Sequence, residues 1–419
     1  MSSHTERVAF VGPDPLPALA TRLDLVCAEY CGLSQEEEPR WDRFAGSGPA
    51  STAAVLARAE VHRYLSSGAD AVLVWKSSAE VERMAGEIGV VLANSPAQIA
   101  RRIENKGYFS RGAPAAGLPI PATRTGVAGF NLLGAAEELT PPLIFQLARG
   151  FSGEQTYLAK TAGDLEELLQ RFRGRACRIA ELVLGTPVTV TGVVSPSRLL
   201  VGPACLQLTG VPSLTPHPLG SCGNDYSQPV PEAQAVHELA LRAGDWLRRL
   251  GHRGIFGLDL VVGEGGSIWC IEINPRLVAS VPLFSLSARG SSRRGILAEH
   301  LASFGIGETG DQDLECDWSQ VILYQRGARR AHSELATAVG TLAPSGHFQP
   351  TGQMGIEGPA KGEVGVIVQS HSRPGKELAR LISEGACCAP DGSLLPQLVS
   401  CVRELRSLLE ESSPDEGVL

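Results

Sequence analysis

Two apolar strands that carry polar side chains constrain this chain more than any other feature of its sequence. The runs 257–262 and 267–274 flank a glycine-rich segment, and this pattern predicts a β-hairpin. Glu272 and Asn274 lie two residues apart in the second run, so their side chains leave the strand on the same face. Asp259, in the first run, can project to that face from the partner strand.

The chemistry of these three side chains favours a metal site. Burying a carboxylate without a partner is costly, and a bound cation removes that cost. Two carboxylates and an amide oxygen are hard oxygen ligands, which Mg²⁺ prefers when it carries nucleotide phosphates. The alternative is a surface hairpin with ordinary acidic positions. We therefore predict a magnesium site at Asp259, Glu272 and Asn274.

The first half of the chain alternates between strand and helix patterns. Over the first 100 residues this alternation predicts a small parallel α/β domain. The predicted strands are 8–13, 71–75, 90–93, 143–147, 156–159, 178–184 and 188–194, and the predicted helices are 50–65, 79–87, 95–112 and 164–172. Asp164 is the expected cap of the last helix, and the last two strands are expected to pair around residues 185–187.

The second half predicts a helix and a C-terminal cap on either side of the hairpin. Residues 202–230 are rich in Pro, Gly, Ser and Thr and are expected to be irregular. An amphipathic helix follows at 232–250. After the hairpin, strands at 321–324 and 364–368 and helices at 376–385 and 395–410 predict a small α/β cap.

Composition narrows the class of protein. The length of 419 residues suggests two to four domains, and the net charge of −8 argues against a nucleic-acid or anionic-membrane partner. No stretch reaches the roughly 18 apolar residues that span a bilayer, and the start lacks a secretory pattern. The ten cysteines show no CxxC spacing, which predicts reduced thiols and a cytoplasmic protein. The nine histidines show no metal-binding spacing, and Cys387 and Cys388 are expected to be packing residues.

The hairpin closely resembles the metal-binding hairpin of ATP-grasp ligases. The resemblance lies in GLDL at 257–260 followed by IEINPR at 271–276. It extends upstream in the family's order, over about residues 95–300. The similar segments are ENKGYFSR at 104–111 (first nucleotide lysine), GLPIP at 117–121 (the motif that closes it), IFQLARGFSG at 144–153 (strand and phosphate loop) and ELVLG at 181–185 (adenine-binding hinge).

This resemblance implies a fold and a set of ligands. The implied fold class is α/β, with a small N-terminal parallel α/β domain (1–100), a two-lobed ATP-grasp core (101–185 and 186–305) and a C-terminal α/β cap (306–419). ATP would lie between the lobes with Mg²⁺, or alternatively Mn²⁺, at the hairpin. The implied nucleotide-binding residues are Lys106, Gln146, Arg149, Gly150, Ser152, Gly153, Glu181, Leu182 and Val183, and Arg276 is the implied catalytic residue.

Two positions depart from the family's pattern. Gln146 stands where the family usually has a second lysine, and Arg149 is the nearby cation that could compensate. Pro187 stands where a glutamate often holds the ribose hydroxyls. The loop 149–155 is expected to close over the phosphates. The basic run at residues 171, 173, 175 and 178 is interpreted as a solvated helix end and the strand after it.

The resemblance implies an ADP-forming carbon–nitrogen ligase. Such an enzyme phosphorylates a carboxylate to an acyl phosphate, which an amine then attacks. The partners are then a small-molecule carboxylate and an amine, with no nucleic acid or membrane, and a homodimer is left open. The layout favours an amino acid or short peptide as substrate. The alternatives are a carboxylase-like or purine-pathway ligase, and a weakly active nucleotide-binding protein.

Overall fold

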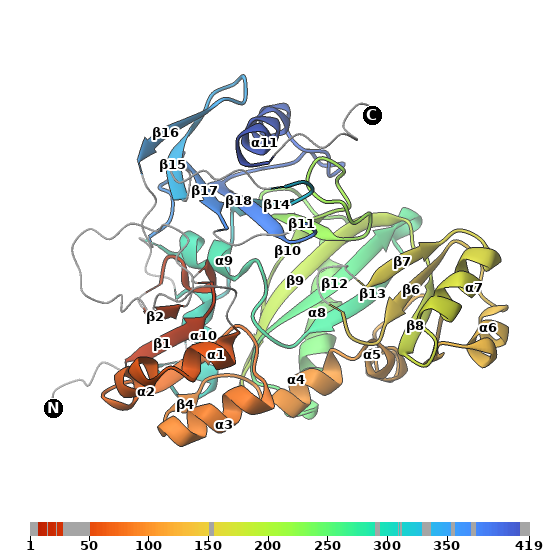
Figure 1. Cartoon of the computed structure of the whole chain (residues 1–419), viewed down its shortest axis with the longest axis horizontal. Coiled ribbons are helices and arrows are strands. Elements are labelled where there is room, and N and C mark those ends of the chain that lie inside the picture. The colour runs from red at the N-terminus through yellow and green to blue at the C-terminus, as the bar shows by residue number, and fades with distance from the viewer. Residues whose placement is uncertain are drawn as a thin grey trace.

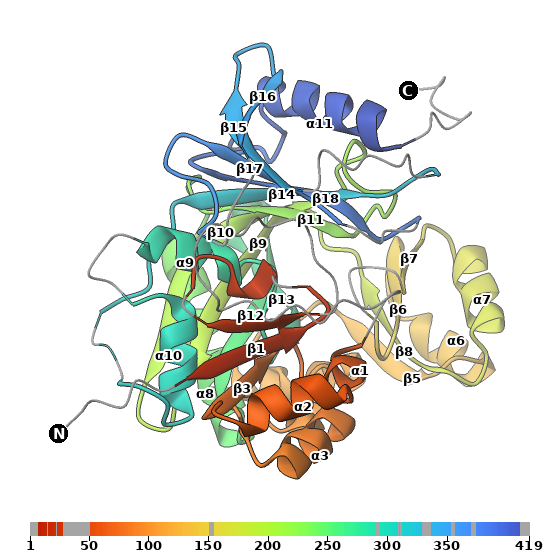
Figure 2. The ribbon, with the colours of Figure 1, turned by 60° about the vertical axis from the view of Figure 1, so that its left-hand side comes forward.

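The structure is a computed structural model, which describes most of the chain. The described residues are 7–14, 16–21, 23–27, 51–150, 155–289, 294–308, 310, 312–328, 337–352, 357–369 and 374–410. Within these ranges, no helix has the length and apolar character that crossing a membrane requires. Figures 1 and 2 show the arrangement of helices and strands from two directions.

The N-terminal part is a four-stranded parallel sheet with the order β2-β1-β3-β4 (Figure 1). Its elements are β1 (Val8–Gly12), η1 (Leu16–Ala18), β2 (Asp24–Cys27), α1 (Thr52–Leu56), α2 (Ala59–Ser66), β3 (Ala71–Val74), α3 (Ala79–Ile88) and β4 (Val91–Leu92). Strands β1 and β3 are buried along their whole length, which explains their continuous apolar sequences. The predicted parallel α/β arrangement is confirmed, but β2 was not predicted and the helix expected over 50–65 is two helices.

Two short helices lead from this sheet to the next one. They are α4 (Ala97–Ile103) and α5 (Lys106–Gly112), followed by η2 (Pro114–Ala116). The single helix predicted over 95–112 is therefore broken. Asn105 causes the new start, because its side chain accepts a hydrogen bond from the Tyr108 N–H and caps α5. Lys106 is consequently the first residue of α5.

A second sheet is four-stranded and antiparallel, with the order β5-β8-β6-β7. Its elements are β5 (Thr123–Val127), α6 (Phe130–Ala136), β6 (Leu143–Leu147), β7 (Thr156–Ala159), α7 (Ala162–Arg171) and β8 (Ala176–Glu181). Helices α6 and α7 lie on the outer side of this sheet (Figure 1). Thr161 rather than Asp164 caps α7; the two form a reciprocal capping box, in which Asp164 is the third helical residue.

A ten-stranded sheet forms the centre of the molecule, with the order β13-β12-β9-β10-β11-β14-β18-β17-β15-β16. Its first part contains β9 (Gly185–Val194), β10 (Leu199–Thr209), β11 (Ser221–Asp225), α8 (Ala233–Arg249), β12 (Gly254–Gly263), η3 (Glu264–Gly266) and β13 (Ile268–Asn274). The predicted hairpin and the helix before it are confirmed. Two expectations were wrong: β8 and β9 belong to different sheets, and the stretch 202–230 contains most of β10 and all of β11.

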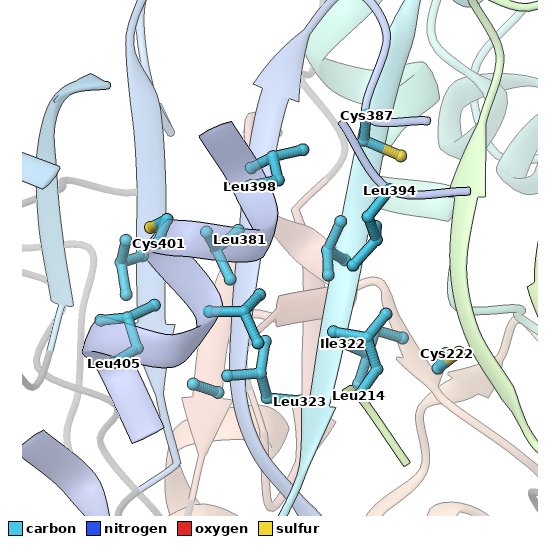
Figure 3. Packing of buried hydrophobic residues seen from close by; sticks show 14 of the residues in the cluster. Leu214, Cys222, Ile322, Leu323, Leu381, Cys387, Leu394, Leu398, Cys401 and Leu405 are labelled. Carbon is cyan, nitrogen blue, oxygen red and sulfur yellow. The ribbon is translucent and has the colours of Figure 1, made fainter. Parts of the chain in front are cut away.

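The same sheet continues across residue 305 into the C-terminal part. The elements there are α9 (Val281–Ala288), α10 (Ile296–Ser303), β14 (Trp318–Tyr324), β15 (Thr337–Leu342), β16 (Phe348–Gly352), β17 (Val364–Val368), β18 (Glu377–Glu384) and α11 (Pro396–Leu409). Figure 3 shows Leu398, Cys401 and Leu405 of α11 near Leu381 of β18. Cys387 is buried in this core, as expected of a packing residue.

One prediction in this region assigned the wrong type of secondary structure. Residues 376–385 were expected to be a helix, but residues 377–384 form strand β18, which pairs with β14 and β17. Leu381 packs into the core beneath α11, whereas Ile382 packs into the core on the other face of the sheet. Because both faces are buried, β18 lacks the alternation by which a half-exposed strand is recognised.

Candidate functional site

A cavity of about 250 Å³ lies between the four-stranded antiparallel sheet and the ten-stranded sheet. Its wall combines residues of β6 and β8 with residues of β9 to β13, and Figure 1 shows these strands adjacent. The lining residues are Lys106, Pro121, Ile144, Gln146, Gly150, Gln155, Thr156, Arg178, Ala180, Glu181, Leu182, Val183, Gly185, Pro187, Gln207, Thr209, Leu219, Ser221, Asp259, Leu260, Val261, Ile271 and Glu272. Most residues that the sequence singled out therefore meet in one place.

The hairpin brings its three polar side chains together on one face. Asp259 and Glu272 are directly opposite each other in the register of β12 and β13. The Asn274 amide Nδ2 donates to Asp259 Oδ2 at 3.2 Å and to Glu272 Oε1 at 3.3 Å. Thr189 of β9 donates to Asp259 Oδ1 at 2.8 Å, and Gln207 of β10 donates to the same oxygen at 3.3 Å.

The two carboxyl groups have opposite electrostatic environments. Burial raises the pKa of Asp259, and the negative charge of Glu272 raises it further. Burial would also raise the pKa of Glu272, but the charges of Lys106 and Arg178 hold it below its usual range. The Lys106 Nζ lies 2.8 Å from Glu272 Oε2. A divalent cation bound here would relieve the repulsion between the carboxylates, so the two carboxylates fit a hard metal ion. Asn274 would add an oxygen ligand only with its amide turned, because its Nδ2 faces the carboxylates and its Oδ1 accepts from Arg276 in this structure.

Arg178 is a member of this site that the sequence interpretation missed. It was expected to lie in a solvated basic run, but its side chain is buried with 5% exposure and lines the cavity. Its Nη1 donates to the carbonyl oxygen of Ile271 at 2.8 Å, and its Nε donates to Gln146 Oε1 at 2.9 Å. The sequence placed Arg178 correctly in a strand, and only its expected solvation was wrong; the apolar neighbours in that strand were the available signal of burial.

The phosphate-loop residues are only partly described. Gly150 lines the cavity, whereas Arg149 is exposed and is not among the lining residues. Ser152 and Gly153, with the centre of the loop expected to close over phosphate, lie outside the described residues. Gln146 is buried, and its Nε2 donates to Thr156 Oγ1 at 3.1 Å.

The predicted hinge forms another part of the cavity wall. Glu181, Leu182 and Val183 all line the cavity. The Leu182 N–H donates to the Pro142 carbonyl oxygen at 3.0 Å, and Thr140 N–H donates to Glu181 Oε1 at 2.8 Å. These contacts fix the hinge backbone against the segment before β6.

Pro187 also faces the cavity, together with hydroxyl-bearing side chains that the sequence did not single out. These are Thr209 of β10 and Ser221 of β11. Both come from the stretch that was expected to be irregular, so no local pattern indicated that they would lie near the hinge.

Arg276 lies behind the hairpin rather than in the cavity wall. Its Nη2 donates to Asn274 Oδ1 at 2.9 Å, and its Nε donates to Glu104 Oε1 at 2.9 Å. The guanidinium also lies over the ring of Trp75, 5.7 Å from its centroid. Arg276 therefore connects Asn274 to the segment before α5, and its catalytic role stays a prediction.

Comparison with known proteins identifies the family of folds to which this architecture is similar. Residues 132–280 match the family described as ATP-grasp domain. No curated protein matches the sequence. Among solved structures, the N5-carboxyaminoimidazole ribonucleotide synthetase of Thermus thermophilus is similar with a TM-score of 0.61 and 15% identity, covering 98% of this chain and 100% of that one.

Two biotin carboxylase structures are similar over most of their length. One is a complex of Campylobacter jejuni biotin carboxylase with β,γ-ATP (TM-score 0.63, 13% identity, 91% of this chain and 87% of that one). The other is the biotin carboxylase domain dimer of Hydrogenobacter thermophilus 2-oxoglutarate carboxylase with MgADP, ADP and bicarbonate (TM-score 0.59, 12% identity, 91% and 86%). The chain thus has the ATP-grasp fold and carries an ATP-grasp domain, as its hairpin sequence implied.

Proposed function

We propose that this chain is an ADP-forming ligase that binds ATP in the cavity between the two sheets. It would transfer the γ-phosphoryl group to a small carboxylic acid and pass the activated carboxyl group to an amine. The observation that carries the proposal is the meeting of Asp259, Glu272 and Asn274 with Lys106 at a cavity that the hinge residues also line.

Each part of the site has a distinct task in this proposal. Asp259, Glu272 and Asn274 would hold Mg²⁺, which neutralises charge on the phosphates when it is bound. Lys106 provides a compact cation beside Glu272, and Gly150 lets the backbone approach a phosphate oxygen. The backbone of Glu181, Leu182 and Val183 would receive adenine. Arg276 holds Asn274 in place, and we keep it as a candidate for steadying the transferred group.

The four-part division of the chain also enters the proposal. Residues 1–100, 101–185, 186–305 and 306–419 would be the N-terminal domain, the small lobe, the large lobe and the cap. The cap strands extend the sheet of the large lobe, so these two parts share one hydrogen-bonded framework. A homodimer is supported by the dimer named for the Hydrogenobacter thermophilus domain. Light scattering of the purified protein would test it.

The similar solved structures favour bicarbonate as the acid substrate. The similar structures are carboxyaminoimidazole ribonucleotide synthetases and biotin carboxylases, and one of them contains bicarbonate. These likenesses support the carboxylase-like alternative better than the amino-acid or peptide ligase that the layout first suggested. We therefore propose bicarbonate as the acid and an amine nitrogen of a small molecule as the acceptor.

A panel of acids and amines tests the reaction. ADP and phosphate release would be measured with Mg²⁺ in bicarbonate-depleted buffer, to which bicarbonate or single amino acids are returned. We expect ADP and phosphate in equal amounts, dependent on bicarbonate and stimulated by the correct amine. Release that depends on an amino acid but not on bicarbonate would overturn the choice of acid. AMP with pyrophosphate would overturn the acyl-phosphate route, and Glu272→Gln serves as the inactive control.

A further inference from the structure

Arg178 is a buried cation whose hydrogen-bond partners, within the described part of the chain, include no carboxylate. Its side chain is 5% exposed, and burial lowers its pKa to about 10, so it carries its charge at neutral pH. Among the described residues it forms no salt bridge, in contrast to Lys106, which is paired with Glu272 at 2.8 Å. The negative charge of Glu272 acts on Arg178, but Glu272 is already paired with Lys106, so a ligand anion would offset the remaining cost of burying the guanidinium.

The orientation of Arg178 leaves part of its guanidinium available. The group has five N–H donors, and three hydrogen bonds are made: two to Gln146 Oε1 and one to the Ile271 carbonyl oxygen. The other two N–H groups have no partner among the residues that the structure describes. The same side chain lines the cavity with Lys106 and Glu272, so these two N–H groups belong to a residue at the place proposed for the phosphates.

Gln146 orients Arg178 instead of contacting phosphate itself. The two residues are directly opposite each other in the register of β6 and β8, so their side chains share one face. The Gln146 carbonyl oxygen accepts from Nε and Nη2 of Arg178, and the Gln146 amide is anchored on Thr156. Gln146 stands where the family resemblance implies a lysine, so the missing charge is present one strand away.

We infer that Arg178 is the second phosphate-binding cation of this site, and that Gln146 is its positioning residue. The ligand class is the polyphosphate of a nucleoside triphosphate, so the inference rests on the proposed function. It replaces Arg149, the exposed residue expected from the sequence to supply this charge. An arginine fork can contact two phosphate oxygens at once, which a glutamine at position 146 cannot do.

Equilibrium binding to the full-length protein tests the inference without requiring turnover. A non-hydrolysable ATP analogue with Mg²⁺ and uncharged adenosine would be titrated into wild type, Arg178→Met, Arg178→Lys and the control Arg175→Met. Arg175 belongs to the same basic run but is exposed and outside the cavity wall. We expect Arg178→Met to weaken analogue binding about 10- to 100-fold, because a charge-assisted hydrogen bond to phosphate is lost. Adenosine binding should be unchanged.

The variants distinguish two roles for Arg178: contact with the ligand phosphate, and a purely structural link between β8 and β13. If Arg178 only holds β8 and β13 together, Arg178→Met should weaken the binding of the analogue and of adenosine equally. Arg178→Lys, which loses the planar guanidinium, should then behave like Arg178→Met. A phosphate contact predicts that Arg178→Lys, which folds with the charge retained, recovers part of the affinity for the analogue. Analogue binding that survives Arg178→Met but is lost in Arg149→Met would overturn the inference. Failure of the wild type to bind the analogue would instead overturn the proposed function.

Discussion

Two buried histidines should make the fold sensitive to mild acid. His300 of α10 accepts a hydrogen bond at Nδ1 from the Ile255 N–H at 2.9 Å, and its Nε2 lies 2.7 Å from the Ala93 carbonyl oxygen. Only a neutral ring with its proton on Nε2 can make both contacts, which tie α10 to β12 and to the residue after β4. His252 is also buried, with Nε2 at 3.2 Å from the Ile255 carbonyl oxygen.

The structure sets the sign and size of the effect. Burial lowers the pKa of His252 to about 3 and that of His300 to about 4, whereas an unfolded histidine titrates near pH 6.5. The unfolded chain therefore binds protons first as pH falls. The contribution of each ring to stability is fully present above about pH 6.5 and decreases toward the folded pKa. As pH falls from 7 to 5, each histidine should lower the unfolding free energy of the protein by about 2 kcal/mol.

Urea unfolding followed by circular dichroism between pH 5 and pH 7 measures this loss. His300→Gln keeps a donor and an acceptor but does not titrate, so its pH-dependent loss should be about 2 kcal/mol smaller than that of wild type. His62, which is exposed on α2, provides the control, and His62→Gln should keep the wild-type pH dependence. Equal pH dependence in wild type, His252→Gln and His300→Gln would refute the reasoning.

Two further predictions concern the metal site and the packing of α5. Glu272→Gln and Asn274→Ala should each lower the rate of ADP formation by at least about 100-fold without changing the circular dichroism spectrum, because each removes a proposed magnesium ligand. Wild-type rates in both variants would contradict the metal assignment. Gly112→Ala should lower the urea-unfolding free energy by about 1–3 kcal/mol, because an added Cβ would lie 2.7 Å from Trp246 Cζ2. An unfolding free energy equal to that of wild type would show that α5 and α8 can separate without cost.

The hairpin could be predicted because its evidence is local. Alternation, a glycine-rich turn and a two-residue spacing are all contained in residues 257–274, and the turn between the strands sets the register. That register pairs Leu260 with Cys270. A shift of one residue between Leu260 and Asp259 then places Asp259 opposite Glu272, and the local pattern did not indicate this shift. The parallel N-terminal sheet was predictable for a similar reason, because its buried strands and short helices alternate along the chain.

The wrong predictions share a different origin. The run 178–194 reads as strand, turn and strand, and that local pattern is the same whether the chain folds back or crosses to another sheet. Here it crosses, because β8 pairs with β5 and β6 while β9 pairs with β10 and β12. Strand β18 was missed because helix α11 covers one of its faces, and that cover lies outside its own sequence.

The site residues that the sequence analysis did not predict were missed for the same reason. Arg178 is 32 positions from Gln146 in sequence, and only the pairing of β6 with β8 places the two side chains together. A basic run beside a helix end is usually solvated, so composition favoured the wrong environment. Thr209 and Ser221 were missed because their strands lie in a segment rich in turn-forming residues.

The pairing of Gln146 with Arg178 leads to a last prediction, whose sign depends on the background. In wild type, Gln146→Lys would place two cations directly opposite each other and remove the acceptor that orients Arg178, so ATP-analogue affinity and stability should both fall. In the Arg178→Met background the same change restores one cation to the shared face, and analogue affinity should rise. A double-mutant cycle on analogue binding measures this coupling, expected at about 1–3 kcal/mol. Gln146→Lys with the same effect in both backgrounds would show that the two positions act independently, and that Gln146 does not position Arg178.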